Sequence, residues 1–155
     1  MFLVETEFLL GLRPSDKWNN LVNEIISLSK MKNVSINYTL SGLLEIRAIL
    51  YSHGKKAGFV HRAIAHLKAK LDEEGIKEIP LTSDDIILAD KLKEETEATY
   101  FDVLHAAVAL RTNLTLISND PIFQSLGVRC LNMKEAVEHL KSKNKKVNFP
   151  CYNIL

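Results

Sequence analysis

Short apolar blocks alternate with longer amphipathic segments along this chain. The blocks are the length of buried strands and lie at residues 1–4, 34–36, 79–81, 114–117 and 128–131. The segments with helical spacing lie at residues 8–11, 18–30, 41–52, 59–74, 82–95, 99–113 and 133–143. Regular alternation of strand and helix is typical of α/β proteins. It predicts a parallel sheet of about five strands with helices on both faces.

The stretch 99–123, TYFDVLHAAVALRTNLTLISNDPIF, carries the clearest pattern. The alanine-rich run 106–110 contains no helix breaker and predicts a helix that ends at Asn113, and the apolar run 114–117 predicts a strand. Ser118 to Pro121 is a turn sequence, which places Asp120 at the carboxyl end of that strand. In parallel α/β sheets ligands bind at this edge. Asp102, on the first turn of the preceding helix, can reach the same edge.

Both aspartates also have a purely structural interpretation. Thr99 to Asp102 has the form of a capping box, and Asp120 followed by Pro121 has the form of a helix N-cap with proline at the first helical position. For either acid alone, capping is the simpler explanation. A functional interpretation therefore needs further acids that reach the same place from elsewhere in the chain.

Length and composition favour one domain. The chain has 155 residues, of which 46% are hydrophobic, and we expect a single domain at residues 1–143 with an irregular tail at 144–155. It contains no apolar run of membrane-spanning length and no basic signal-peptide start, so we expect a cytoplasmic protein without membrane contact. Two cysteines without metal-ligand spacing suit a reducing compartment.

Charge limits how the protein can hold a polyanion. The net charge is +1, so long-range attraction to nucleic acid is small, and local basic groups must supply any phosphate contacts. The one dense cluster is Lys141, Lys143, Lys145 and Lys146, for which a solvated helix end is the simpler interpretation. No strand is followed by a glycine-rich phosphate loop, which argues against a dinucleotide-binding or P-loop enzyme.

Four acids occupy comparable places in the predicted fold. Glu5 follows the first strand, Glu45 lies in the helix after the second, Asp102 opens a helix, and Asp120 follows the fourth strand. Carboxylates brought together repel one another, and a divalent cation compensates for that repulsion. Mg²⁺ and Mn²⁺ prefer carboxylate and water oxygens, and such a site can activate water for attack on a phosphodiester.

Four segments together resemble the PIN-domain ribonucleases, which include the VapC-like toxins. They are FLVETEFLLGL, LSGLLEIRAIL with Glu45, YFDVLHAAVALR with Asp102, and LISNDPIF with Asp120. The resemblance covers about residues 1–140 and implies a three-layer α/β/α sandwich that cuts RNA with Mg²⁺ or Mn²⁺. It also implies an antitoxin protein as a partner and a homodimer.

Carried over residue by residue, the resemblance implies that Glu5, Glu45, Asp102 and Asp120 line the metal site. Ser118 falls where the family often has a serine or threonine that orients the attacking water or a metal ligand, and Thr6 follows the first acid as it does in the family.

The first acid departs from the family pattern, which has aspartate there and asparagine two residues later. Here these residues are Glu5 and Glu7. An added methylene displaces the carboxylate, and Mg²⁺ geometry tolerates displacement poorly. Three consequences stay open: a shifted site, a preference for Mn²⁺, or loss of catalysis. The last would leave a PIN-like module that binds RNA or protein without cutting. A generic α/β domain with its acids scattered by more than ~10 Å is a third interpretation.

Further residues near these acids have two interpretations each. His105 lies one helical turn beyond Asp102 and either contacts it or a phosphate, or is a packed histidine with a satisfied ring, which is the simpler alternative. Arg13 and Lys17 can contact RNA or be ordinary surface residues. Tyr100 and Phe101 can stack on a base or pack in the core.

Overall fold

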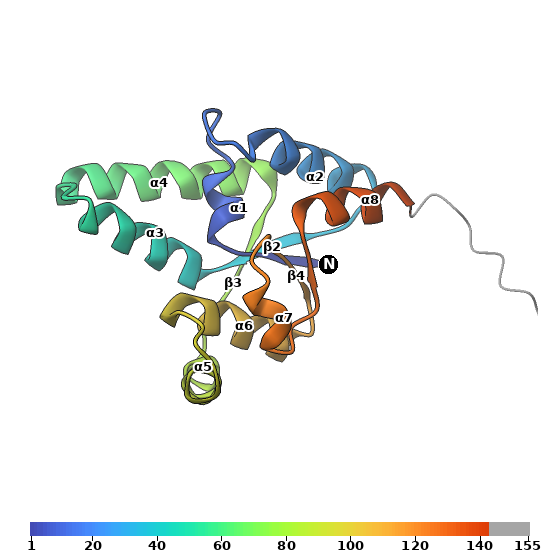
Figure 1. Ribbon diagram of the computed structural model, residues 1–155. Coiled ribbons are helices and arrows are strands. Elements are labelled where there is room, and N and C mark those ends of the chain that lie inside the picture. The colour runs from blue at the N-terminus through green and yellow to red at the C-terminus, as the bar shows by residue number, and fades with distance from the viewer. Residues whose placement is uncertain (143–155) are drawn as a thin grey trace, which may run out of the picture.

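A five-stranded sheet lies at the centre of the computed structural model, which describes residues 1–142 (Figure 1). The strand order is β3-β2-β1-β4-β5 and all four pairings are parallel, which confirms the predicted α/β class. The strands are β1 (Phe2–Val4), β2 (Ile36–Thr39), β3 (Lys77–Ile79), β4 (Thr115–Ile117) and β5 (Cys130–Leu131). The helices are α1 (Thr6–Leu10), α2 (Asn19–Met31), α3 (Leu40–Ser52), α4 (Ala57–Glu74), α5 (Ser83–Glu95), α6 (Tyr100–Thr112), α7 (Ile122–Ser125) and α8 (Met133–Ser142).

Two strands are displaced from their predicted positions. β2 was expected at 34–36 but continues through two buried polar residues, Asn37 and Thr39. The Asn37 side-chain amide donates to the Phe2 carbonyl, so a polar residue is accommodated inside the sheet. β3 was expected at 79–81 but is an edge strand with exposed Lys77 and Glu78. Apolar pattern alone does not mark a strand of this kind.

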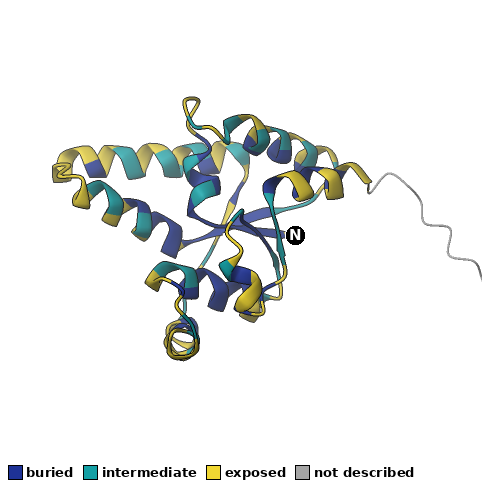
Figure 2. Cartoon of the chain, viewed as in Figure 1, coloured by how far each residue is buried: buried dark blue, intermediate teal, exposed yellow. Residues whose placement is uncertain are grey.

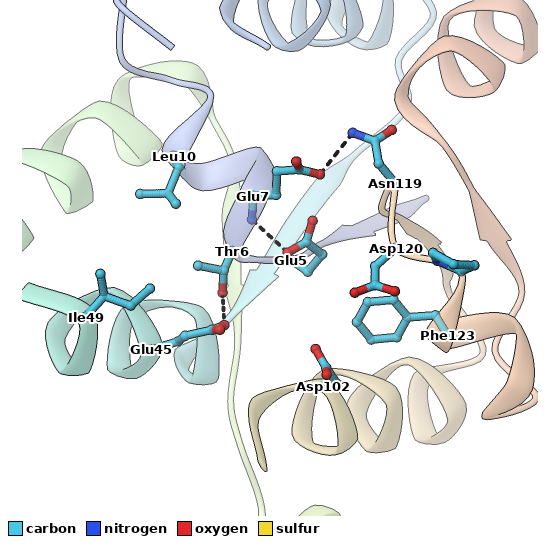
Figure 3. A pocket seen from close by; sticks show the side chains of 11 residues that line it. Glu5, Thr6, Glu7, Leu10, Glu45, Ile49, Asp102, Asn119, Asp120 and Phe123 are labelled. Carbon is cyan, nitrogen blue, oxygen red and sulfur yellow. Dashed lines mark hydrogen bonds between the residues drawn. The ribbon is translucent and has the colours of Figure 1, made fainter. Parts of the chain in front are cut away.

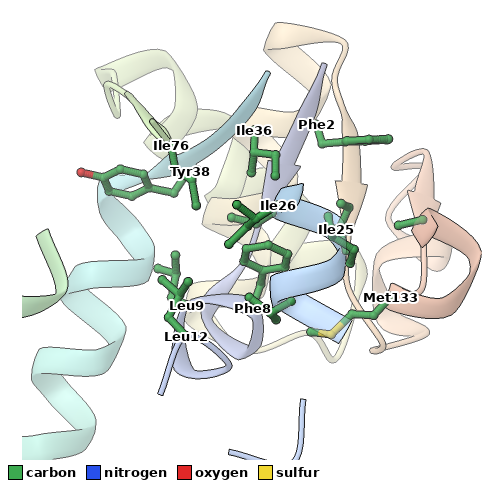
Figure 4. Packing of buried hydrophobic residues seen from close by; sticks show 14 of the residues in the cluster. Phe2, Phe8, Leu9, Leu12, Ile25, Ile26, Ile36, Tyr38, Ile76 and Met133 are labelled. Carbon is green, nitrogen blue, oxygen red and sulfur yellow. The ribbon is translucent and has the colours of Figure 1, made fainter. Parts of the chain in front are cut away.

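Helices cover both faces of the sheet and make three layers. On one side, α1, α2 and α8 pack on Phe2 and Val4 of β1 around the buried rings and aliphatic side chains shown in Figure 4. On the other side, α5, α6 and α7 pack on Leu3 and Leu116. Alternate residues of β1 thus supply opposite cores, as the pleat of a strand requires. Buried positions run along the sheet and the inner sides of these helices, with exposed positions outside (Figure 2).

Helices α3 and α4 run side by side away from the sheet (Figure 1). The base of α3 packs closely against α1, because Gly42 has no side chain: a Cβ there would stand 2.8 Å from Leu9 Cδ1. This close approach brings α3, and with it Glu45, next to the end of β1. Within residues 1–142, no helix is long and apolar enough to pass through a lipid bilayer.

Helices α5 and α6 are joined by an ion pair beneath the sheet. Arg111 Nε donates to Asp85 Oδ1 at 2.6 Å and Arg111 Nη2 to Asp85 Oδ2 at 3.0 Å. Burial alone would raise the pKa of the Asp85 carboxyl, but hydrogen bonds from Arg111 and Thr82 hold that pKa below its ordinary value. The pair fixes α6, the helix that carries Asp102 and His105.

The predicted tail at 144–155 and three of the four clustered lysines lie outside the described residues, and the domain boundary at residue 143 stays a prediction. The remaining cluster member, Lys141, pairs with Glu24 of α2 at 2.7 Å.

Candidate active site

The carboxyl edge of the sheet forms an acidic pocket of about 530 Å³. Val4 of β1 is in register with Tyr38 of β2 and Ile117 of β4, so the residues that follow these three strands come out at one level. All four predicted acids line the pocket, as does Glu7 (Figure 3). The lining residues are Glu5, Thr6, Glu7, Leu10, Glu45, Ile49, Asp102, Asn119, Asp120, Pro121 and Phe123. We call this set the acidic pocket.

Glu5 is the most deeply buried of these acids. It is the N-cap of α1, and its Oε2 accepts a hydrogen bond from the Glu7 backbone N–H at 2.7 Å. Its Oε1 is buried and has no hydrogen-bond partner among the described residues. Burial raises the pKa of this carboxyl to about 8; the Glu7 N–H lowers it in part, the charges of Glu7 and Glu45 raise it, and Ser118 lowers it. A nearby cation would favour the ionised form.

Glu45 is held by contacts from two other helices. The Thr6 hydroxyl of α1 donates to Glu45 Oε2, and His105 Nε2 of α6 lies 3.6 Å from the same oxygen. Burial alone would raise the pKa of Glu45, but the contacts with His105 and Thr6 keep that pKa below its ordinary value. Glu45 is therefore an ionised carboxylate at the wall of the acidic pocket.

His105 belongs to a buried chain of hydroxyl groups rather than to the Asp102 side chain. Its Nε2 lies 3.2 Å from Thr6 Oγ1 and its Nδ1 lies 3.4 Å from Ser41 Oγ, which in turn lies 2.7 Å from Thr39 Oγ1. Because the Thr6 hydrogen goes to Glu45, the Nε2 atom must be the donor to Thr6. The structure therefore supports the interpretation of His105 as a packed histidine with a satisfied ring. The acid that His105 contacts is Glu45.

Asp102 and Asp120 both make contacts at helix starts, although the N-cap of α7 is Pro121 rather than the predicted Asp120. Asp102 Oδ2 accepts from Thr99 N at 2.8 Å and from Thr99 Oγ1, which completes the capping box of α6. Asp120 Oδ1 accepts from Ile122 N at 2.9 Å at the start of α7. Each carboxylate nevertheless lines the acidic pocket, so capping positions these side chains without removing them from the site.

Ser118 lies behind the lining of the acidic pocket. Its buried hydroxyl accepts a hydrogen bond from the Asp120 backbone N–H at 3.0 Å, and it is not one of the pocket-lining residues. A direct role in orienting water stays a prediction; the observed contact holds the turn that carries Asp120.

Glu7 occupies the rim of the pocket with both carboxylate oxygens engaged. Oε1 accepts from Trp18 Nε1 at 2.6 Å, and Oε2 accepts from Asn119 Nδ2 at 2.9 Å. The sequence marks Glu7 only as a departure from a family pattern. Nothing in the spacing of Glu7, Trp18 and Asn119 indicates that their side chains meet, because the contacts depend on how α1, α2 and the turn after β4 pack.

The donor set of the pocket fits a hard divalent cation. Five carboxyl groups line it and none of the eleven lining residues is a lysine or arginine, so no side-chain cation there offsets the acids. The unpartnered Glu5 Oε1 offers an oxygen ligand. Within residues 1–142, no three histidine, cysteine, aspartate or glutamate side chains already form a set that could hold a metal ion. Side-chain rotation is therefore needed before several of these oxygens can share one ion.

The aromatic and basic candidates lie outside the pocket lining. Arg13 pairs with Asp16 at 3.4 Å, and Lys17 lies over the Trp18 ring. Tyr100 is 63% exposed and contacts the Phe101 ring edge-on. Their contact with RNA stays a prediction.

Comparison with known proteins identifies the family. The family model described as PIN domain matches residues 42–128, which span α3 to the segment before β5 and include Glu45, Asp102 and Asp120. No curated protein matches the sequence.

Solved structures share the fold. One is PAE2754 from Pyrobaculum aerophilum, with 17% sequence identity and a TM-score of 0.61 over 91% of this chain and 95% of that one. Another is VapBC2 from Rickettsia felis bound to a promoter DNA fragment, with 18% identity and a TM-score of 0.59 over 84% and 97%. A third is VapC20 from Mycobacterium tuberculosis, described as a sarcin-ricin loop cleaving toxin, with 19% identity and a TM-score of 0.58 over 83% and 96%. Because the family model matches more than half of this chain, the chain belongs to the PIN domain family.

Proposed function

We propose that this protein is a metal-dependent endoribonuclease and the toxin of a toxin–antitoxin pair. The observation that carries the proposal is the gathering of Glu5, Glu45, Asp102 and Asp120, from four separate segments, around one pocket whose lining contains no basic side chain. A fold stabilises such a cluster most simply by binding a cation there. Membership of the PIN family and the likeness to toxin structures support the assignment.

The four acids would hold Mg²⁺ or Mn²⁺. When bound, the ion would polarise a phosphodiester and lower the pKa of a water molecule, so that no side-chain nucleophile is needed. Glu45 is ionised because its contacts with His105 and Thr6 keep the pKa of its carboxyl group below the ordinary value. Asp102 and Asp120 are held at the rim by their own helix starts. Ser118 would act on the ion indirectly, through the backbone of Asp120.

An antitoxin protein is the proposed partner. Solved structures with this fold include a toxin–antitoxin complex from Klebsiella pneumoniae, with 13% identity and a TM-score of 0.56 over 86% of this chain and 98% of that chain. RNA as substrate would place the protein in the cytoplasm, and a homodimer is proposed on the family resemblance.

A second candidate function is binding without cleavage. Glu5 favours it, because its side chain is one methylene longer than the aspartate of the family pattern and is drawn into a buried position. In that case the acidic pocket would bind no catalytic ion, and the domain would act as an RNA-binding or protein-binding module.

RNA cleavage with purified protein distinguishes the two functions. Wild type, Asp102→Asn and Glu5→Asp are assayed with Mn²⁺, with Mg²⁺ and with EDTA. Asp84→Asn, at an exposed residue in the first turn of α5, serves as a matched control. For a nuclease we expect cleavage by wild type and by the control, abolished by EDTA, and a loss on the order of a hundredfold or more in Asp102→Asn. Cleavage by Glu5→Asp alone would identify the natural protein as the non-cutting module.

Crystals soaked in Mn²⁺ give an independent test. Anomalous density between Asp102 and Asp120 would support the metal site. A map that shows ordered side chains and no density in the acidic pocket at millimolar Mn²⁺ would contradict it.

A further inference from the structure

Glu7 lines the acidic pocket, but both oxygens of its carboxylate accept hydrogen bonds from neighbouring side chains. The Trp18 indole donates to Oε1 at 2.6 Å, and the Asn119 amide donates to Oε2 at 2.9 Å. Asn119 then accepts at Oδ1 from the Met133 backbone N–H, at 3.1 Å. We call Glu7, Trp18 and Asn119 the Glu7 network. It ties α1 to the segment before α2, to the turn after β4, and to the start of α8.

The donor and acceptor pattern of the Glu7 network requires a carboxylate. The Met133 N–H fixes which end of the Asn119 amide is oxygen, so its NH₂ group must face Glu7. A glutamine at position 7 has only one acceptor oxygen for the two donors. Its own NH₂ would therefore face either Trp18 or Asn119, and one hydrogen bond would be lost. The charge at Glu7 thus has a structural reason that does not involve an ion.

The turn that Asn119 belongs to carries Asp120 into the pocket. The Asp120 backbone N–H donates to the Ser118 hydroxyl on one side. On the other side, Asn119 donates to Glu7 (Figure 3). The Asp120 carboxylate also accepts from Ile122 N. Loss of the Glu7 contact would leave this turn held by the Met133 N–H, by the bond from Ser118 N to the Leu131 carbonyl and by its local contacts. The direction of the Asp120 side chain would follow that looser backbone.

We propose that Glu7 is a positioning residue, which holds Asn119 and thereby fixes Asp120 in the orientation that the metal site uses. The inference rests on the proposed metal-dependent function. It explains why a fifth acid stands at the rim of a site already crowded with negative charge. It assigns Glu7 no bond to the ion or to RNA.

A swapped pair provides the test. Glu7→Gln leaves two NH₂ groups opposed, and Asn119→Asp opposes two carboxylates. The double variant Glu7→Gln/Asn119→Asp restores every donor–acceptor pair. Only the bond between positions 7 and 119 is reversed, with the Gln NH₂ donating to the aspartate, while Gln Oε1 still accepts from Trp18 and the aspartate still accepts from Met133 N. Its net charge equals that of wild type. Glu73→Gln, at a 70% exposed side chain on α4, is the matched control.

Two measurements do not depend on catalysis. The protein has one tryptophan, so a single indole ¹⁵N–¹H resonance reports on the Trp18 hydrogen bond. The Asp120 backbone amide resonance reports on the turn. Mn²⁺ affinity, measured by calorimetry, reports on the ion site itself.

Each single variant should shift the Asp120 resonance and weaken Mn²⁺ binding about tenfold, as loss of one hydrogen bond to a charged group allows. The double variant should recover the wild-type Asp120 resonance and an affinity within about threefold of wild type. Glu73→Gln should match wild type in both.

Three results would overturn the inference. The Asp120 resonance in Glu7→Gln could coincide with that of wild type. The double variant could show no recovery over the single variants. It could also recover the resonance without recovering affinity, which would make Glu7 a ligand of the ion. If wild type binds no Mn²⁺, the proposed function fails, while the resonances of the swapped pair still decide whether Glu7 positions Asp120.

Discussion

Thr6 and His105 lie 99 positions apart in the sequence, and their side chains meet at 3.2 Å behind the acidic pocket. Thr6 also donates to Glu45, so one hydroxyl joins α1, α3 and α6. Both residues are buried, and a buried polar group without a partner is costly. This contact therefore couples the stability of the core to the arrangement of the site.

Thr6→Val should destabilise the protein and disturb Glu45. Valine has the same shape but no hydroxyl, so His105 Nε2 and Glu45 Oε2 each lose a partner. We expect the free energy of unfolding to fall by about 1–3 kcal/mol, measured by urea denaturation. Thr6→Ser keeps the hydroxyl and should retain most of that stability. A clear loss in Thr6→Ser with little loss in Thr6→Val would instead show that packing of the methyl group, rather than the hydrogen bonds, matters at this position.

Asp102→Asn should separate stability from activity. Asparagine keeps an acceptor oxygen for Thr99, and the lost charge costs only the interaction with the helix N-terminus, about 0.3–1 kcal/mol. The thermal midpoint should therefore stay close to that of wild type, while Mn²⁺ affinity falls about tenfold or more. A large drop in the midpoint with unchanged affinity would make Asp102 a cap alone.

Asp85→Asn should lower stability and leave Mn²⁺ affinity unchanged, which is the opposite of the effect expected for Asp102→Asn. Asp85 nevertheless occupies the same capping-box position in α5 as Asp102 does in α6. The substitution removes the charge that pairs with Arg111 and should lower the free energy of unfolding by about 2 kcal/mol at neutral pH, without changing Mn²⁺ affinity.

The same pair predicts how stability depends on pH. The pKa of folded Asp85 lies below its ordinary value of 3.8, because hydrogen bonds from Arg111 and Thr82 outweigh the effect of burial. Its contribution is therefore present above pH 3.8 and disappears as the pH falls through the folded-state pKa. Unfolding of wild type and Asp85→Asn should converge in acid. A constant difference between them from pH 7 to pH 2 would contradict this account.

Divalent ions should stabilise the folded protein. At a Mn²⁺ concentration one hundred times its dissociation constant, the gain is about 2.7 kcal/mol, and EDTA should remove it. Glu5→Gln should reduce this gain, because it removes a ligand charge. In EDTA, the same variant should be at least as stable as wild type, because glutamine carries no charge for burial, and then for the charges of Glu7 and Glu45, to disfavour. A large loss of stability in EDTA would instead identify Glu5 mainly as a helix cap.

The order of strands and helices could be predicted because the buried strands and the alanine-rich helix α6 have strong apolar patterns. The edge strand β3 and the polar end of β2 could not be placed, because their residues are set by neighbours in the sheet. The capping box at Thr99 was predicted correctly, since it depends on residues three positions apart.

The positions of the four acids at one sheet edge followed from topology, and the pocket confirms that they lie together. The hydrogen bonds that hold these acids in place could not be predicted from the sequence. The Thr6 and Ser41 contacts of His105, and those of Trp18 and Asn119 with Glu7, join residues far apart in the chain. No local pattern predicts such contacts, because they form only when the helices pack.

The position of β1 has a consequence for synthesis. β1 pairs on one side with β2 and on the other with β4, which begins only at Thr115. A ribosome adds the intervening residues over a time on the order of ten seconds. Until β4 is available, the central strand β1 lacks one of its two neighbours. Asp102 and Asp120 then cannot take up their positions beside Glu5 and Glu45. Under the proposed function, the metal site would therefore become competent only after β4 has been synthesised.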